Sequence, residues 1–278
     1  MGSGLGLASR LRALCLGLAA TLAPGATAAE EIPVDLELVI AVDVSRSMDF
    51  FEAELQRQGY ARAIQHSQFL RAVTESGLHG RIAVTYIEWA GTHYQKTVAD
   101  WVMVDGQESA AELAELIQLA PFTHEFRTSI GHAIAYSMAL FEDNGFAGLR
   151  QVIDISGDGA NNQGVPVDEA REAAIAAGIT INGLPIMTGR SNPYGWLTID
   201  NLDEYYADCV IGGPGAFLVP VRERSQFIEA IRRKLLLEIA GLTPEPESLV
   251  IPIQARPTVD CLIGERQWER YMRRWSDP

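Results

Sequence analysis

One carboxylate and two hydroxyls follow an apolar run near the start of the chain, in the pattern Asp43-x-Ser45-x-Ser47. The run before them, residues 36–42, is rich in apolar and β-branched side chains, as expected of a strand buried on both faces of a parallel sheet. Ligands of open α/β sheets lie at the carboxyl ends of the strands, where these three side chains fall. Hydroxyl and carboxylate oxygens are the ligands that Mg²⁺ prefers. The pattern therefore predicts part of a site for a small divalent cation.

Two later segments supply further ligands for the predicted site. Thr128 lies where a helix is expected to begin, and Asp158 follows a second apolar strand at 150–156. Both fall at the same edge of a parallel sheet as Asp43, so two carboxylates and three hydroxyls converge there. Mg²⁺ commonly uses one or two protein carboxylates and keeps several waters, so at least one position stays open. A carboxylate from a partner could fill that position, with helix N-termini after Ser47 and at Thr128 helping to hold the anion.

The elements that must position these residues alternate along the chain. This alternation predicts an α/β fold with a doubly wound, mainly parallel sheet and helices on both faces. Strands are expected at 36–43, 81–89, 96–104, 150–156, 179–186 and 216–219. The second and third are in hairpin relation, which adds one antiparallel edge strand. Helices are expected at 48–75, 109–119, 128–141, 166–177, 201–206 and 225–239.

Residues 1–29 have the composition of a secretory signal. Arg10 and Arg12 form its charged start, residues 11–22 its apolar centre, and residues 26–29 offer small side chains for cleavage. The apolar centre is shorter than the ~20 residues that a membrane span needs, so only an uncleaved signal would anchor the chain in a membrane. We therefore predict an exported protein.

The alternating pattern covers residues 34–240, and a C-terminal extension follows at 241–278. Several prolines between 244 and 257 exclude a regular helix there. The end of the extension spaces aromatic and apolar side chains at helical intervals among arginines: Trp268, Tyr271, Met272 and Trp275. Such a stripe either binds a partner or packs on its own domain, and packing on the domain is the commoner outcome.

Charge and cysteine content narrow the classes of function. The chain has 22 basic and 36 acidic residues, and the signal takes away two arginines and no acid, which leaves 20 against 36 and a net charge of −16. Such a surface disfavours binding to nucleic acid and to anionic lipid. Cys209 and Cys261 remain after cleavage. In an oxidising compartment an even count suggests one disulfide, and two buried thiols are the alternative.

Together these residues resemble the von Willebrand factor type A fold and its metal-ion-dependent adhesion site. The resemblance spans about residues 34–240 and rests on Asp43-x-Ser45-x-Ser47, on Thr128 with Gly131 three residues later, and on Ser156-Gly157-Asp158-Gly159. Within that superfamily the chain resembles an uncharacterised group of bacterial exported proteins, through Tyr86-Ile-Glu-Trp89 and Cys209-Val-Ile-Gly-Gly-Pro-Gly215. A bacterial relationship favours a periplasmic location, with full secretion as the alternative.

The resemblance implies a non-catalytic domain that binds a protein ligand through a divalent cation. By position, Ser45, Ser47 and Thr128 would be hydroxyl ligands, and Asp43 and Asp158 carboxylate ligands. Mg²⁺ is the expected ion, with Mn²⁺ or Ca²⁺ as alternatives, and the partner is expected to supply a carboxylate. The competing interpretation is that Ser45 and Thr128 only cap helices, while Asp158 makes a turn.

Two features of the sequence depart from the common pattern of that fold. Arg46 places a cation beside the site, where it would contact either an acidic ligand or a surface carboxylate. Glu88 and Trp89 stand where the second strand commonly ends in Phe-Ser. For Glu88, a structural hydrogen bond is favoured over a role at the metal.

Catalytic alternatives have less support in the sequence. His93, His124 and His132 lack the spacing of a zinc site. Ser156 has Asp154 at the position where a nucleophile elbow needs glycine, and no phosphate-binding glycine loop follows a strand. We therefore predict that the protein is not an enzyme. Two alternatives stay open: a metal-dependent hydrolase at the same site, which would need a general base, and a structural envelope protein that binds through its C-terminal tail.

Overall fold

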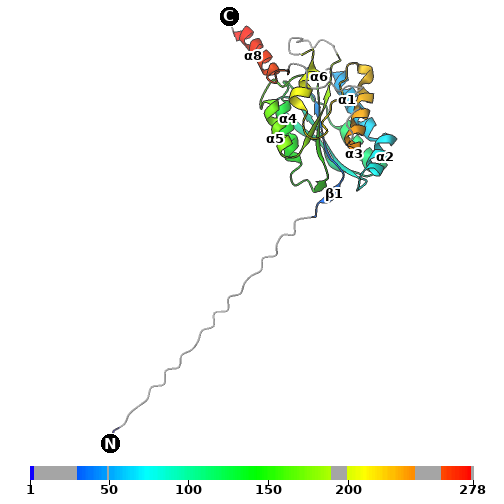
Figure 1. The fold of residues 1–278 in the computed structure, drawn as a ribbon, viewed down its shortest axis with the longest axis vertical. Coiled ribbons are helices and arrows are strands. Elements are labelled where there is room, and N and C mark those ends of the chain that lie inside the picture. The colour runs from blue at the N-terminus through cyan, green and yellow to red at the C-terminus, as the bar shows by residue number, and fades with distance from the viewer. Residues whose placement is uncertain (3–29, 49, 189–198, 242–257, 277–278) are drawn as a thin grey trace. The chain divides into compact units, whose positions relative to one another are not determined.

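The computed structural model describes residues 1–2, 30–48, 50–188, 199–241 and 258–276 (Figure 1). Residues 1–30 and 31–278 form separate units, and the helices and strands of the described residues lie in the second. The predicted secretory signal at 1–29 thus lies almost wholly outside the described residues. None of the described helices combines the length and apolar content that a membrane crossing requires.

Five strands form the central sheet, in the order β4-β3-β2-β6-β7. They are β2 (Glu37–Asp43), β3 (Ile82–Trp89), β4 (Gln95–Val104), β6 (Gln151–Gly157) and β7 (Thr180–Pro185). All neighbours pair in parallel except β3 and β4, which are antiparallel. The mainly parallel sheet with one antiparallel edge strand is therefore confirmed.

The central strand β2 separates two apolar cores. Leu38, Ile40 and Val42 contribute to a core that includes side chains of α1 (Phe50–Ile64), α2 (Ser67–Ser76), α3 (Gln107–Leu119) and α7 (Phe227–Ala240). Val39 and Ala41 belong to the other core, with α4 (Ile130–Leu140) and α5 (Val167–Ala176). Figure 1 shows α4 and α5 on the opposite side of the sheet from α1, α2 and α3. Each fully buried aliphatic side chain contributes about 1.5–3 kcal/mol, so burial on both faces fixes the strand and the position of its carboxyl end.

The remaining elements are short or lie at the C-terminus. Helix α6 (Leu202–Tyr205) continues into a π-helical turn, Tyr206–Val210, and a 3₁₀ turn, Arg224–Gln226, precedes α7. Helix α8 (Ile263–Ser276) lies within the extension. A separate parallel pair joins β1 (Ile32–Val34) to β5 (Phe146–Gly148). Three residues are too few for a periodic pattern, so the sequence does not predict this pair.

The single helix predicted at 48–75 is wrong, because the chain forms α1 and α2 with a break between them. His66 takes an extended conformation there, and its Nδ1 accepts the N–H of Gln68 at 3.2 Å, which caps α2. Apolar residues continue at helical spacing on both sides, so the hydrophobic pattern alone does not reveal the break.

The strand predicted at 216–219 is also wrong, although this segment lies along β7. It forms only isolated bridges, such as Gly183 with Leu218. The carbonyl of Ile181 already accepts the N–H of Gly212, and the N–H of Phe217 turns instead to the side chain of Asn182. This side-chain acceptor interrupts the ladder that a regular strand needs.

Candidate metal centre

Three loops meet at the carboxyl edge of the sheet, and the five predicted ligands lie on them. Asp43 ends β2 and pairs in register with Trp89 at the end of β3. Asp158 follows the last residue of the neighbouring strand β6. Thr128 lies two residues before the start of α4. Because β2 and β6 pair in parallel, Asp43 and Asp158 leave the sheet side by side.

Backbone hydrogen bonds join these loops to one another. The N–H of Glu125 donates to the carbonyl of Val44 at 3.1 Å, and the N–H of Arg46 donates to the carbonyl of Glu125 at 2.9 Å. The N–H of Asn162 donates to the carbonyl of Thr128, also at 2.9 Å. The loop that holds Thr128 is thus fixed between the loops that hold Asp43 and Asp158.

Polar side chains connect four of the five predicted ligands. The N–H of Ser45 donates to Asp43 Oδ1 at 2.7 Å, and the Oγ atoms of Ser45 and Ser47 are 2.8 Å apart. Ser47 Oγ donates to Asp158 Oδ1 at 2.6 Å. The structure therefore brings together Asp43, Ser45, Ser47 and Asp158 as the sequence predicts.

Thr128 lies beside this set rather than within its hydrogen-bond chain. Its side chain is buried, and a Cβ atom built on Gly159 would lie 3.7 Å from Thr128 Oγ1. Its N–H donates to Asn162 Oδ1 at 3.1 Å, which fixes the backbone at this position. The hydroxyl thus lies near Gly159, the residue that follows Asp158.

The two carboxylates lie in a setting that opposes their negative charge. Asp43 is fully buried, and this burial, together with the charge of Asp158, raises the pKa of Asp43 well above its usual value. Asp158 keeps some exposure, but partial burial and the charge of Glu52 raise its pKa to about 7, against the lowering effect of the Ser47 hydroxyl. No ion pair joins either carboxylate to an arginine or lysine of the described ranges.

The donor set and the space around it fit a small hard cation. Asp43 Oδ2 is buried and has no hydrogen-bond partner among the residues that the structure describes. A Cβ atom on Gly157 would lie 2.9 Å from both Asp43 Oδ2 and the hydroxyl of Tyr206, so a side chain at this position would crowd the oxygen. The described residues contain no group of three or more His, Cys, Asp or Glu placed to hold a metal. Any cation here would therefore depend on hydroxyl ligands as well as carboxylates, as Mg²⁺ sites often do.

The two departures from the common pattern have structural partners. The Arg46 guanidinium lies 3.8 Å from the centre of the Phe126 ring. A contact of Arg46 with an acidic ligand stays a prediction. Glu88 forms a buried ion pair with Arg57, at 2.5 Å between Oε1 and a terminal guanidinium nitrogen. Arg57 thereby opposes the rise that burial causes in the pKa of Glu88. The structural hydrogen bond predicted for Glu88 is confirmed.

The edge of the site also contains exposed aromatic side chains that the sequence does not single out. Phe50, Phe51 and Phe126 are 62%, 59% and 58% exposed, respectively. Phe50 packs edge-on against Phe122 at 5.3 Å between ring centres, and Phe122 packs against His124 at 4.6 Å. We call Phe50, Phe51, Phe122 and Phe126 the aromatic rim. The large exposed area of three of its rings is unusual for a surface without a partner.

The C-terminal extension reaches the same edge. Cys209 and Cys261 form the predicted disulfide. The Trp268 ring of α8 lies 3.3 Å from the Arg127 guanidinium, and Ile263 packs against the core beside α4 and α5. Trp268, the first residue of the aromatic stripe, thus packs on its own domain, as favoured from the sequence, whereas Met272 is 48% exposed. The side chain of Trp275 lies outside the described residues.

Comparison with known proteins places these features in a family. A family model described as "Protein of unknown function (DUF1194)" matches residues 33–243. No curated protein matches the chain. Among solved structures, proximal thread matrix protein 1 from the mussel byssus is similar, with a TM-score of 0.54 and 17% identity over 76% of this chain and 49% of its own. A further structure of that protein, with a TM-score of 0.51, has a zinc-occupied MIDAS motif.

Two bacterial structures show the same fold at low identity. The von Willebrand factor type A protein from Catenulispora acidiphila has a TM-score of 0.51 and 16% identity over 74% of this chain and 43% of its own. The pilus adhesin SpaC from Lactobacillus rhamnosus GG, in its open conformation, has a TM-score of 0.53 and 13% identity over 74% and 30%. The chain spans half or less of the length of these proteins. At such identity the likeness establishes the fold alone.

Proposed function

The chain belongs to the DUF1194 family and has the fold of von Willebrand factor type A domains, and we propose that it binds a carboxylate-bearing protein ligand through a divalent cation. The ligands of the cation would be Asp43, Ser45, Ser47, Thr128 and Asp158. One observation supports this proposal above all: two neighbouring carboxylates are held in a desolvated setting without an ion pair to a described arginine or lysine. The zinc-occupied MIDAS motif of the byssus protein shows that this fold accommodates a divalent cation at such a motif.

Asp43, Asp158 and Ser47 would each have a different role in binding the cation. Asp43 is kept in place by the N–H of Ser45, which leaves its Oδ2 to face the ion. Asp158 must lose its proton, and the Ser47 hydroxyl that donates to it can turn its oxygen lone pairs toward the ion instead. The bound cation supplies a positive centre that attracts a carboxylate of the partner. We expect Mg²⁺ as the resident ion, because it uses few protein carboxylates and leaves positions for outside ligands.

The surroundings favour a macromolecular ligand over hydrolysis of a small substrate. Phe50, Phe51 and Phe126 expose large apolar surfaces beside the site, and such patches mark interaction surfaces. A hydrolase would need a general base close to the metal. Asp154 is paired with Lys234 in the core, so it is not placed as a general base. We therefore propose a binding protein without catalytic activity.

We further propose that the protein is exported, to the periplasm or beyond the cell. The disulfide between Cys209 and Cys261 supports this location, because disulfides persist in oxidising compartments. The signal-like composition of residues 1–29 supports it independently.

Affinity capture from an extract of the source cells tests the proposed function. Three samples are immobilised. They are wild-type protein in Mg²⁺, wild-type protein in Mg²⁺ followed by chelator, and the Asp43→Asn variant in Mg²⁺. We expect a partner that is retained only by wild type in Mg²⁺ and that binds again when purified. Glu269→Gln, a change on the exposed face of α8, serves as the matched control and should retain the partner. Equal retention in all samples would contradict cation-dependent binding.

A further inference from the structure

We propose that the first turns of α8 brace the metal-site loops, so that Gly264, Glu265 and Trp268 are positioning residues for cation binding. The proposal rests on the metal site proposed above and concerns a part of the chain outside the segment that resembles the von Willebrand fold. Its basis is a continuous set of contacts from the disulfide, through two loops, to Thr128.

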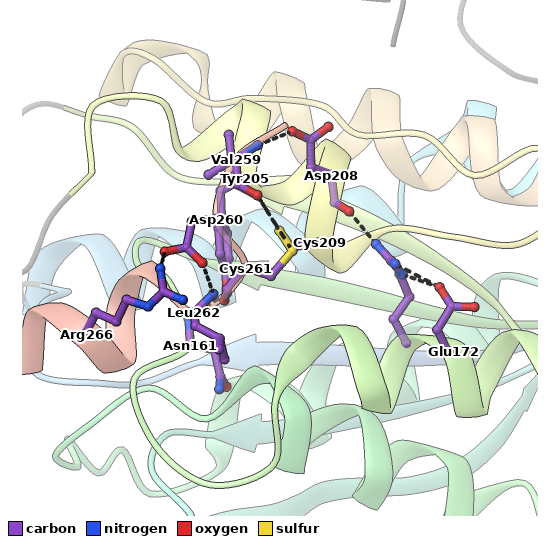
Figure 2. Close-up of a disulfide and its surroundings, with 11 residues drawn as sticks. Asn161, Glu172, Tyr205, Asp208, Cys209, Val259, Asp260, Cys261, Leu262 and Arg266 are labelled. Atoms are coloured by element: carbon purple, nitrogen blue, oxygen red, sulfur yellow. Dashed lines mark hydrogen bonds and ion pairs between the residues drawn. A yellow bond between two sulfur atoms is a disulfide. The ribbon is translucent and has the colours of Figure 1, made fainter. Parts of the chain in front are cut away.

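The segment before α8 is fixed to the domain by a disulfide and two hydrogen bonds. The disulfide joins Cys261 to Cys209 in the π-helical turn, and the N–H of Val259 donates to Asp208 Oδ2 at 2.8 Å. The Tyr205 hydroxyl donates to the carbonyl of Cys261 at 3.4 Å. Figure 2 shows these residues together, with Asn161 beside Leu262. The start of α8 therefore has a defined position on the domain.

From this position α8 packs directly on the loop after Asp158. A Cβ atom on Gly264 would lie 2.0 Å from the carbonyl oxygen of Asn161, so only glycine permits this approach of helix and loop. Glu265 Oε1 accepts a hydrogen bond from Asn161 Nδ2 at 2.6 Å. On its other side, the N–H of Asn161 donates to the Tyr205 hydroxyl at 3.1 Å. Asn161 is thus held between α8 and α6.

The held loop in turn positions a predicted ligand. Asn161 Oδ1 accepts the N–H of Gly131 at 3.2 Å, which fixes the first turn of α4. The adjacent residue Asn162 exchanges two hydrogen bonds with the backbone of Thr128, at 3.1 and 2.9 Å. A shift of Asn161 would therefore move Thr128 relative to Asp158.

A second contact reaches Thr128 from the preceding residue. Arg127 adopts a left-handed backbone conformation with φ of 76°, which is unfavourable for a residue other than glycine. Its guanidinium lies 3.3 Å from the centre of the Trp268 ring, in a cation–π contact. Trp268 thus stabilises the strained conformation next to Thr128.

The described contacts between α8 and the two loops involve residues of α8 up to Trp268. Beyond it, Glu269, Arg270 and Arg274 are exposed, and Glu269 pairs with Arg273 on the same helix at 3.4 Å. Glu269 therefore offers a control change on α8 that should leave the loops unaltered.

The test compares Glu265→Ala and Trp268→Ala with wild type, Glu265→Gln and the control Glu269→Ala, all in the full chain. Mn²⁺ affinity is measured by titration, and amide hydrogen exchange is measured over 127–131 and 158–162 without metal. We expect Glu265→Ala and Trp268→Ala each to weaken Mn²⁺ binding about tenfold, the range found when residues that orient metal ligands are changed. Exchange in both loops should rise, Glu265→Gln should largely restore the wild-type values, and Glu269→Ala should match wild type.

A Cys209→Ser, Cys261→Ser double variant provides an independent arm, because it releases the tether without touching the loops. It should also weaken Mn²⁺ binding and raise exchange in both loops. Wild-type Mn²⁺ affinity and unchanged loop exchange in all variants would overturn the brace and leave the metal site standing. If wild type itself bound no Mn²⁺, the proposed function would fail first, and the brace would fail with it.

Discussion

Two pairs of carboxylates lie at or near the strand β6, and they differ in the positive charge that neutralises them. Asp154, within β6, and Glu238 share Lys234, whose Nζ lies 2.6 Å from an oxygen of each. The second pair is Asp158, four residues after Asp154, and Asp43 at the end of β2. These two share no arginine or lysine of the described ranges. The first pair is closed off in the core, whereas Asp158 keeps contact with solvent.

The difference separates a cluster that has its own cation from the pair of carboxylates at which we propose that a metal ion binds. The charges of Asp154 and Glu238 raise the pKa of Lys234 despite its burial, so the lysine stays charged and pairs with both carboxylates. Asn182 adds a hydrogen bond to Glu238 at 2.6 Å. The cation of this cluster is part of the chain. Asp43 and Asp158 have no such partner among the described arginines and lysines, and under the proposed function a metal ion from solution would take that role.

Removing the internal cation should give the largest effect on stability. Lys234→Met leaves two carboxylates buried without a partner, and we expect the free energy of unfolding to fall by about 3–5 kcal/mol. Urea denaturation with and without Mg²⁺ measures this, and Mg²⁺ should not restore the loss. The triple change Lys234→Met, Asp154→Asn, Glu238→Gln should recover part of it. A loss below about 1 kcal/mol would show that Lys234 is not the essential partner.

Neutralising a carboxylate of the proposed metal site should instead change the stability that the protein gains when Mn²⁺ is added. At an Mn²⁺ concentration of 100 times its Kd, wild type should gain about 2.7 kcal/mol of stability, and Asp158→Asn should gain none. Thermal melting with and without Mn²⁺ measures the gain. Asp154→Asn, on the same strand, is the matched control: it should lower the melting temperature but retain the response to Mn²⁺. The comparison breaks down if the two variants respond alike.

The raised pKa of Asp158 predicts a dependence on pH with a definite sign. The folded protein holds this proton up to about pH 7, whereas the unfolded chain releases it near 3.8. The metal-free protein should therefore lose stability as pH rises from about 4 to about 7. Above about pH 7, the ionisation of Asp158 should cause no further loss. Mn²⁺ competes with the proton, so its affinity should rise by up to about tenfold between pH 6 and pH 7, equivalent to about 1.4 kcal/mol. Titrations at both pH values check this, and a fall in affinity over that range would contradict it.

The smallest effect is expected when the exposed Arg46, which follows Ser45, is changed. Arg46 stacks on Phe126 and forms no ion pair with Asp43 or Asp158 among the described contacts. Arg46→Ala should therefore change Mn²⁺ affinity by less than about twofold and stability by about 0.5 kcal/mol or less. A large gain in Mn²⁺ affinity in this variant would mean that Arg46 competes with the metal.

The sequence predicts the sheet and the gathering of the site residues for one physical reason. Apart from Glu37, the run 36–42 is apolar, which is typical of strands buried on both faces, and parallel pairing brings the carboxyl ends of such strands to one edge. Asp43 and Asp158 could therefore be placed together without knowledge of any contact between them. The short pair β1 and β5 has no such pattern and was not predicted.

Features that depend on tertiary contacts could not be predicted in this way. Lys234 lies in a predicted amphipathic helix and has the type of a solvent-facing residue, yet it is fully buried beside Asp154. Glu265 and Asn161 are 104 residues apart, and no local pattern indicates that they bond. The break at His66 depends on a single side-chain cap, which the apolar spacing around it conceals.

The most direct test of the central claim is the amount of Mn²⁺ bound at saturation by wild type and by Asp43→Asn, measured by electron paramagnetic resonance. Asn keeps an oxygen that can accept the N–H of Ser45, so the fold of the loop should survive, and circular dichroism checks this. We predict one Mn²⁺ bound for each wild-type chain and none for Asp43→Asn. Absence of binding to wild type, or equal binding to both proteins, would contradict the account.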